Sequence, residues 1–127
     1  MICLDAAVLN DGESFNTAFG GGARNGVDGF VPVPGRGPAS TAVPRTVPHP
    51  AKTLSEPVKL EHQDAVKKIP TTYALFIPPG RPMEQAPFFR FYQRAKERGW
   101  TLVTLESDHV AQKSHPRELV ALIEKAP

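Results

Sequence analysis

Glycine and proline are unevenly distributed along this 127-residue chain, and their distribution limits where a core can form. The chain has 10 glycines and 14 prolines, and most of them lie between Gly20 and Pro50. Proline lacks a backbone N–H and glycine loses much conformational entropy on folding, so both work against helices and strands. We therefore expect a long loop or disordered segment over residues 15–60 and the most ordered core over residues 69–127.

The length and the cysteine content limit how such a core can be stabilised. A chain of this length has room for one domain. If only about 60 to 70 residues pack together, a single hydrophobic core is marginal without disulfides, a metal or a partner. Cys3 is the only cysteine, so an internal disulfide is excluded.

The charge pattern and the N-terminal residues exclude two classes of partner. The formal net charge is +2, with both signs mixed along the chain, so there is no basic face for a phosphate backbone and no nucleic acid is expected. Residues 1–9 are apolar except for Asp5, carry no basic side chain and are far shorter than the ~20 residues of a membrane span. We expect a soluble, cytoplasmic protein without a signal peptide or a membrane partner.

No cofactor or metal is expected from the motifs. Residues 20–26 invite comparison with a dinucleotide fingerprint, but Asn25 replaces the third glycine and prolines follow in place of a helix. His109 and His115 have no cysteine or carboxylate cluster to complete a metal site. The remaining histidines are interpreted as solvated or capping residues: His49, His62 and His115.

The first apolar run is interpreted as a strand. Residues 2–9 are almost continuously apolar and end at Asn10, Asp11 and Gly12, which is typical of a buried strand of a parallel sheet stopped by a turn. A simple edge strand explains the pattern equally well. A strand buried on both faces normally has neighbours on both sides, so the first interpretation suggests that preceding strands have been lost. Without them, the strand would present an unpaired edge, which invites self-association.

The second half of the chain alternates strands and helices. Residues 71–77 and 100–105 are predicted strands, and residues 86–98 and 114–125 are predicted helices with their apolar side chains at helical spacing. Strand, helix, strand, helix is the pattern of right-handed crossovers in a parallel sheet. The expected fold class is α/β, with three parallel strands, flanking helices and one long irregular segment.

Two residues at the carboxyl ends of these strands could carry chemistry. In open parallel sheets, ligands and catalytic groups gather at those ends. His109 follows the third strand and Asp5 lies toward the end of the first, so the twist of the sheet could bring the carboxylate against the imidazole. An aspartate that accepts the ring N–H fixes the histidine tautomer and stabilises the imidazolium. The alternative for Asp5 is a strand-end residue that bonds loop amides, and Asp108 fits the role poorly because adjacent side chains diverge.

The order of several short segments resembles a known superfamily. These segments are residues 4–14, 48–53, 56–57, 69–73, 99–100 and His109 followed by residues 114–119. Together they resemble the α/β-hydrolase superfamily, and more narrowly the C-terminal half of small esterases related to plant methylesterases and hydroxynitrile lyases. The resemblance implies that residues 1–127 form a partial α/β-hydrolase fold, that residues 15–60 are a cap over the active site, and that His109 is the triad base.

The resemblance leaves the acid of the triad open. The family's usual position follows the second strand, where residues 77–85 contain Glu84 and no aspartate. Haloalkane dehalogenases are among the relatives that place the acid one strand earlier, which corresponds to Asp5. We prefer Asp5, because Glu84 is equally explained as an acidic residue near a helix N-terminus.

The nucleophile of such a triad is missing from the sequence. No Gly-x-Ser-x-Gly elbow occurs in the 127 residues. The available serines lack that context: Ser14, Ser40, Ser55, Ser107 and Ser114. We therefore expect a C-terminal fragment of a serine hydrolase, inactive alone, whose full-length relative acts on a small-molecule ester or acyl substrate. The alternative is a non-catalytic interaction protein that reuses the half-fold and makes contacts through its Gly/Pro segment.

Overall fold

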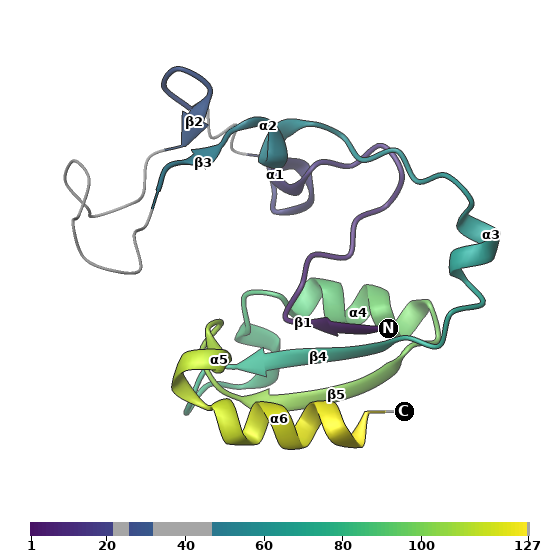
Figure 1. Cartoon of the computed structure of the whole chain (residues 1–127), viewed down its shortest axis with the longest axis vertical. Coiled ribbons are helices and arrows are strands. Elements are labelled where there is room, and N and C mark those ends of the chain that lie inside the picture. The colour runs from purple at the N-terminus through teal and green to yellow at the C-terminus, as the bar shows by residue number, and fades with distance from the viewer. Residues whose placement is uncertain (22–25, 32–46, 127) are drawn as a thin grey trace. The chain divides into compact units, whose positions relative to one another are not determined.

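A computed structural model describes residues 1–21, 26–31 and 47–126, and these residues form two compact units (Figure 1). One unit consists of Met1–Val8 with His62–Pro127, and the other is Leu9–Glu61. Ser40 and most of the glycine- and proline-rich tract, including part of the fingerprint-like segment, lie outside the described residues.

The first unit contains a three-stranded parallel sheet. Its strands are β1 (Ile2–Leu4), β4 (Thr72–Ile77) and β5 (Thr101–Glu106), in the order β1-β4-β5. Both pairings are parallel, with Ile2 opposite Thr72 and Thr72 opposite Thr101. The predicted α/β class with three parallel strands is therefore confirmed for this unit.

The central position of β4 follows from its composition. Residues 72–76 are all buried, as is usual for a strand with neighbours on both sides and helices on both faces. Ala74 and Phe76 pack with Ala111 and Leu119 in one core cluster. Tyr73 points to the opposite face, where its ring meets that of Tyr92 edge-on at a centroid separation of 6.4 Å.

The first strand is shorter than predicted, because it ends at Leu4 and not at residue 9. Asp5 has φ of +42°, which lies outside the β region, and its N–H donates the last ladder bond to Ala74 O at 2.8 Å. The following apolar residues therefore leave the sheet. The expected edge is present in the described residues, where β1 pairs with β4 alone.

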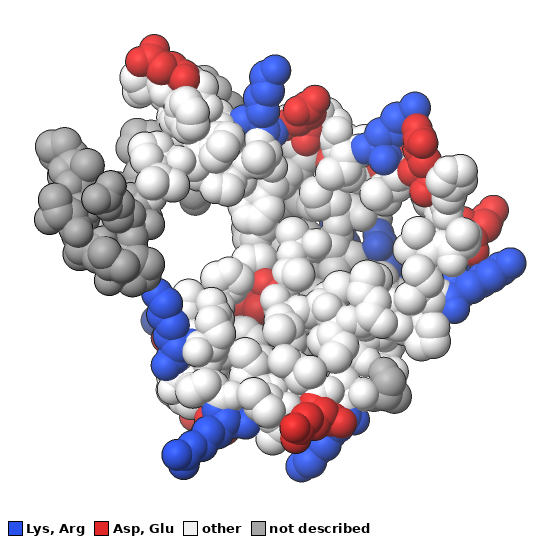
Figure 2. All heavy atoms as spheres, viewed as in Figure 1, with Lys and Arg blue, Asp and Glu red and all other residues white. Residues whose placement is uncertain are grey.

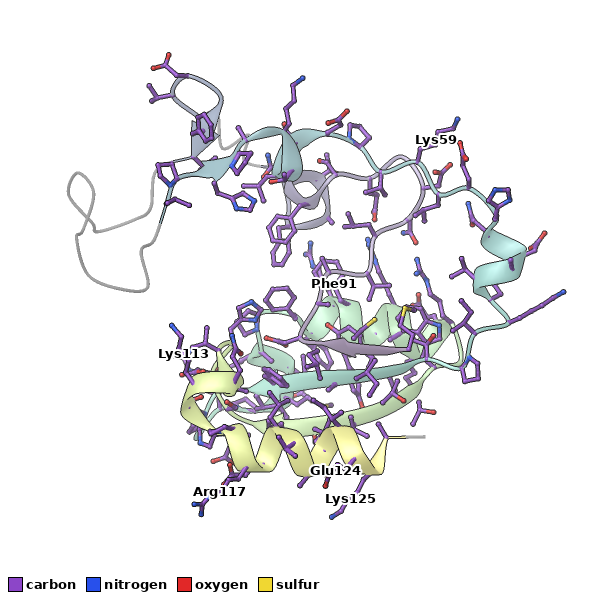
Figure 3. The ribbon with its side chains drawn as sticks, viewed as in Figure 1. Lys59, Phe91, Lys113, Arg117, Glu124 and Lys125 are labelled. Atoms are coloured by element: carbon purple, nitrogen blue, oxygen red, sulfur yellow. The ribbon has the colours of Figure 1, made fainter. Side chains whose placement is uncertain are left out.

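Helices cover both faces of this sheet (Figure 1). The two longer helices are α4 (Phe89–Glu97) and α6 (Pro116–Lys125). The shorter helices of this unit are α3 (Gln63–Val66), which is exposed and lies away from the sheet, η1 (Met83–Gln85) and α5 (Ala111–Ser114). Figure 1 shows α4 and α6 on opposite sides of the sheet, which gives three layers. In Figure 3, Arg117, Glu124 and Lys125 project from α6 away from the sheet.

The two predicted helices differ from the observed ones at their starts. The helix predicted over residues 86–98 begins at Phe89, because residues 83–85 form a separate 3₁₀ turn. The helix predicted over residues 114–125 begins at Pro116, and the short helix α5 ends just before it at Ser114. His115 lies between the two helices with φ −137° and ψ 54°. A residue that precedes proline is pushed out of the helical region, so Pro116 explains the break. Ser114 consequently ends α5 and does not cap α6.

The described part of the second unit is ordered locally, in contrast to the expected loop. It contains α1 (Phe15–Ala18), α2 (Lys52–Ser55) and an antiparallel pair of β2 (Phe30–Val31) and β3 (His49–Pro50). Ser14 and Thr17 form a capping box at the start of α1. Elements of two to four residues give no periodic pattern, which explains why the sequence did not indicate them.

Backbone bonds join the two ends of this second unit. Gly12 N–H donates to Val58 O at 2.9 Å, and Val58 N–H donates to Glu13 O at 2.8 Å. The Asp11 carboxylate accepts the Leu60 N–H at 2.7 Å. Residues 11–13 and residues 58–60, at the two ends of this unit, are therefore hydrogen-bonded to each other.

Two surface properties concern partners. Within the described ranges, no helix has the length and apolarity needed to cross a membrane. On the face shown in Figure 2, positive and negative side chains are interspersed and do not gather in a patch of one sign.

The core around α4 gives a first prediction. Phe91 is fully buried, so Phe91→Ala should lower the free energy of unfolding by about 3–5 kcal/mol through lost burial and a new cavity. Urea unfolding followed by circular dichroism measures this change. Gln93→Ala, two residues along on the exposed side of α4, is the control and should change stability by no more than about 0.5 kcal/mol. Equal effects of the two substitutions would contradict the assigned packing of α4.

The edge at β1 gives a second prediction. We expect the chain to associate with itself as its concentration rises, because the outer N–H and C=O groups of an edge strand can pair with another chain. Sedimentation velocity over a concentration series tests this. Val120→Lys removes an exposed apolar side chain from α6 and should leave the association unchanged. A monomer at every concentration, or association abolished by Val120→Lys, would contradict the role of the strand edge.

Candidate functional site

Asp5 lies where β1 ends, in a conformation that few residue types adopt. Its positive φ places it in the left-handed region, which aspartate tolerates better than most residues other than glycine. Its side chain is 2% exposed. A buried carboxylate is costly unless hydrogen-bonded, so the partners of its two oxygens determine what it does.

Each oxygen of the Asp5 carboxylate has its own partner. Oδ1 accepts the backbone N–H of Phe76 at 3.1 Å, and Oδ2 lies 2.7 Å from Nδ1 of His109. The alternative interpretation, in which Asp5 bonds loop amides, was wrong in its partner, because the amide that Oδ1 accepts belongs to strand β4. The contact between Asp5 and His109 that the sequence suggested is present.

His109 lies in the loop after β5, and its imidazole is held from two directions. Asp5 holds Nδ1, while the ring of Phe88 stacks on the imidazole with centroids 4.8 Å apart and an interplanar angle of 3°. The side chain is nevertheless 61% exposed. Among the described residues, no group forms a hydrogen bond with its other nitrogen, Nε2.

Side chains also fix the segment that follows Asp5. The Tyr73 hydroxyl donates to Ala6 O at 2.8 Å, and the Arg94 guanidinium donates to Val8 O at 2.9 Å. Burial, followed by the nearby Asp5 charge, raises the pKa of Tyr73, so this phenol stays protonated and keeps donating. The backbone beside the carboxylate is thus held by donors from β4 and α4.

This geometry suits an imidazole that exchanges protons at Nε2. A carboxylate at Nδ1 places the proton of the neutral ring on Nδ1, which leaves a lone pair on Nε2. When Nε2 takes a proton, the same carboxylate stabilises the imidazolium. The exposed Nε2 edge is therefore able to act as a general base toward a hydroxyl brought within hydrogen-bond distance.

The other carboxylates considered from the sequence lie elsewhere. Glu84 is exposed in η1. Asp108 accepts both the Val110 N–H and the Ser114 hydroxyl at 2.9 Å through its Oδ1 atom. Because Nδ1 of His109 is occupied by Asp5, neither of these residues is needed to orient the ring. The catalytic role of the pair stays a prediction.

The described serines are engaged in local bonds. Ser14 caps α1, and the Ser55 hydroxyl donates to Ala51 O at 3.1 Å. Ser107 and Ser114 contact each other at 3.2 Å. None of these four hydroxyls forms a hydrogen bond with His109 in the described part of the chain, so the structure adds no nucleophile to the pair.

Two features of the site were missed by the sequence analysis. Phe88 was assigned to the apolar face of a helix, but it precedes α4 and stacks on His109. His115 was interpreted as solvated or capping, but its ring is half-buried and its Nδ1 lies 3.0 Å from the Ser107 hydroxyl. Phe88 lies close to the start of the helix predicted over residues 86–98, where helix boundaries are least certain. Nothing in the sequence pairs residues 107 and 115.

The two remaining histidines lie in exposed segments of the chain. His49 is exposed and contacts the Thr53 hydroxyl, and His62 is exposed at the start of α3 without a capping bond from its side chain. Within residues 1–21, 26–31 and 47–126, no group of three His, Cys, Asp or Glu residues is placed to hold a metal ion.

The different partners of the Asp5 oxygens give a third prediction. In Asp5→Asn, the amide oxygen should keep the Phe76 N–H, so the amide NH₂ faces His109 and donates to Nδ1. The neutral ring of His109 should then change from the Nδ1–H to the Nε2–H tautomer. Long-range ¹H–¹⁵N correlation spectra of the histidine rings distinguish the two forms.

Glu84→Gln is the matched control for this experiment. It makes the same chemical change at an exposed carboxylate and should leave His109 in the Nδ1–H form. Two results would show that Asp5 does not orient His109. One is an unchanged tautomer in Asp5→Asn, and the other is a neutral His109 ring with its proton on Nε2 in the unmodified protein.

No protein-family model, curated protein or solved structure gives a significant match to this chain. The parallel α/β arrangement is therefore established by the chain's own structure. The resemblance to α/β-hydrolases stays a prediction, and what the Asp5–His109 pair can do follows from its geometry alone.

Proposed function

We propose that this chain carries the base and the acid of a serine α/β-hydrolase, with His109 as the base and Asp5 as the acid that orients it. The observation that carries the proposal is the 2.7 Å contact between a buried carboxylate and an exposed imidazole. Both residues follow the carboxyl ends of parallel strands, where catalytic groups gather in folds of this class.

The proposed reaction is acyl transfer from a small-molecule ester. A serine hydroxyl attacks the carbonyl carbon while Nε2 of His109 takes its proton, and the Asp5 carboxylate stabilises the resulting imidazolium. His109 then returns the proton to the departing alcohol, which leaves an acyl-serine. A water molecule then attacks the acyl carbon while Nε2 takes its proton, and His109 gives that proton to the serine oxygen as the carboxylic acid product leaves.

The nucleophile has to lie outside these 127 residues. The sequence contains no Gly-x-Ser-x-Gly elbow, and the described serines hold local structure. The oxyanion-hole amide that follows the nucleophile is missing with it. The proposal thus concerns the C-terminal portion of a larger catalytic unit.

The missing nucleophile also favours a second candidate, a non-catalytic interaction protein built on the half-fold. The compact Leu9–Glu61 unit would supply the contact surface in that case. Under this candidate, the Asp5–His109 contact serves to tie the loop after β5 to the sheet. Only the first candidate requires Nε2 to exchange protons with a substrate.

The proposal predicts that the DNA upstream of the Met1 codon encodes the missing nucleophile. An in-frame Gly-x-Ser-x-Gly should precede it by about 20 to 30 codons, ahead of a helix. The longer protein should hydrolyse p-nitrophenyl acetate, and His109→Ala should abolish that activity. Asp5→Asn should lower kcat by about 10³- to 10⁴-fold, because it stabilises the wrong tautomer of the base.

Controls separate the proposal from its alternatives. Glu84→Gln should leave kcat unchanged if Asp5 is the acid, and the 127-residue chain alone should be no faster than its His109→Ala variant. Full activity in His109→Ala, or no upstream elbow together with a cooperatively folded and inactive chain, would contradict the proposal. The last outcome would favour the interaction protein.

A further inference from the structure

A second polar cluster lies beside the proposed base and joins the two ends of its loop. Ser107, the first residue after β5, is fully buried and extends the sheet ladder by donating its N–H to Ile77 O at 2.9 Å. Its hydroxyl lies 3.0 Å from Nδ1 of His115 and 3.2 Å from the Ser114 hydroxyl. The Ser114 hydroxyl donates in turn to Asp108 at 2.9 Å.

The number of protons available fixes the direction of these bonds. A carboxylate only accepts, so the single hydroxyl proton of Ser114 points to Asp108. In the Ser107–Ser114 contact, the proton must therefore come from Ser107. With its own proton used there, Ser107 can only accept from His115, whose Nδ1 must carry a proton.

We propose that His115, Ser107, Ser114 and Asp108 form a directed hydrogen-bond chain, from Nδ1–H of His115 to the Asp108 carboxylate, which positions the loop that presents His109. Ser107 and Ser114 are then positioning residues for the proposed base. They do not touch His109 and act through the backbone on either side of it.

The hydrogen-bond chain connects residues on both sides of His109. The His109 side chain is largely exposed, so its position depends on the Asp5 and Phe88 contacts and on the conformation of the loop that carries it. Asp108, immediately before it, accepts both the Val110 N–H and the Ser114 hydroxyl. The loop is thus pinned on both sides of His109, which keeps Nδ1 within reach of Asp5.

The break between α5 and α6 is part of the same arrangement. His115 lies at this break because it precedes Pro116, and its ring reaches the buried hydroxyl of Ser107. In a continuous helix, residue 115 would have helical dihedral angles, and its side chain would point in a different direction. The His–Pro pair therefore brings the proton donor of the chain to the start of the loop.

Ser114 is the residue at which to test the inference, because it is exposed and its loss should not prevent folding. In the unmodified protein, ring ¹H–¹⁵N spectra should show His115 with a proton on Nδ1. In Ser114→Ala, Ser107 no longer has an acceptor there and can donate to His115, so the His115 ring should change to the Nε2–H tautomer. Ser114→Thr keeps the hydroxyl and should retain the original tautomer, and Lys113→Ala is the neighbouring control.

The positioning role is tested on His109 in the same samples. Ser114→Ala should speed the exchange of the His109 Nδ1 proton with water by about twofold to tenfold, the change in population that one lost hydrogen bond produces. Ser114→Thr and Lys113→Ala should leave that exchange rate unchanged. Thermal unfolding of all three variants shows whether a change in exchange merely follows global stability.

Each negative result has a separate meaning. An Nε2–H tautomer of His115 in the unmodified protein would overturn the directed chain. An unchanged exchange rate of the His109 proton in Ser114→Ala would overturn the positioning role. The positioning role rests on the proposed function, but failure of that function would appear as activity surviving His109→Ala, which leaves the His115 tautomer unaffected.

Discussion

The two oxygens of Asp5 connect three parts of the chain that are far apart in sequence. Oδ1 bonds the backbone of β4, Oδ2 bonds the imidazole beyond β5, and the residue itself ends β1. The carboxyl ends of all three strands are therefore linked through one side chain. This linkage has a cost, because a non-glycine residue in the left-handed region is strained by about 1–3 kcal/mol. Loss of either partner would also leave part of a buried carboxylate unpaired, which costs free energy.

Much of the fold could be predicted from the sequence because its strands have clear boundaries. Residues 71–77 lie between two proline-containing stops, and β4 occupies Thr72–Ile77. The first strand was predicted too long, since the apolar pattern continues through residue 9 while Asp5 turns the backbone away. Hydrophobic periodicity reports burial, and the residues after Asp5 are covered without being part of the sheet.

The site was less predictable than the fold, for a physical reason. Asp5 and His109 could be paired from the sequence because the carboxyl ends of parallel strands converge at one edge. The stacking of Phe88 on His109 and the bond between His115 and Ser107 depend on side-chain directions in irregular segments. No repeating pattern encodes those directions. Pro116, by contrast, was a usable signal, because proline is favoured in the first turn of a helix and α6 begins at this residue.

The donors from Tyr73 and Arg94 have a consequence for the path of the chain as it leaves β1. Their acceptors, the carbonyls of Ala6 and Val8, lie in the segment that follows Asp5 directly. Two side chains, one from β4 and one from α4, therefore hold a segment that belongs to no strand itself. The route out of the sheet is consequently encoded on β4 and α4 and can be redirected during evolution by changing either donor, while the order and register of the strands are preserved.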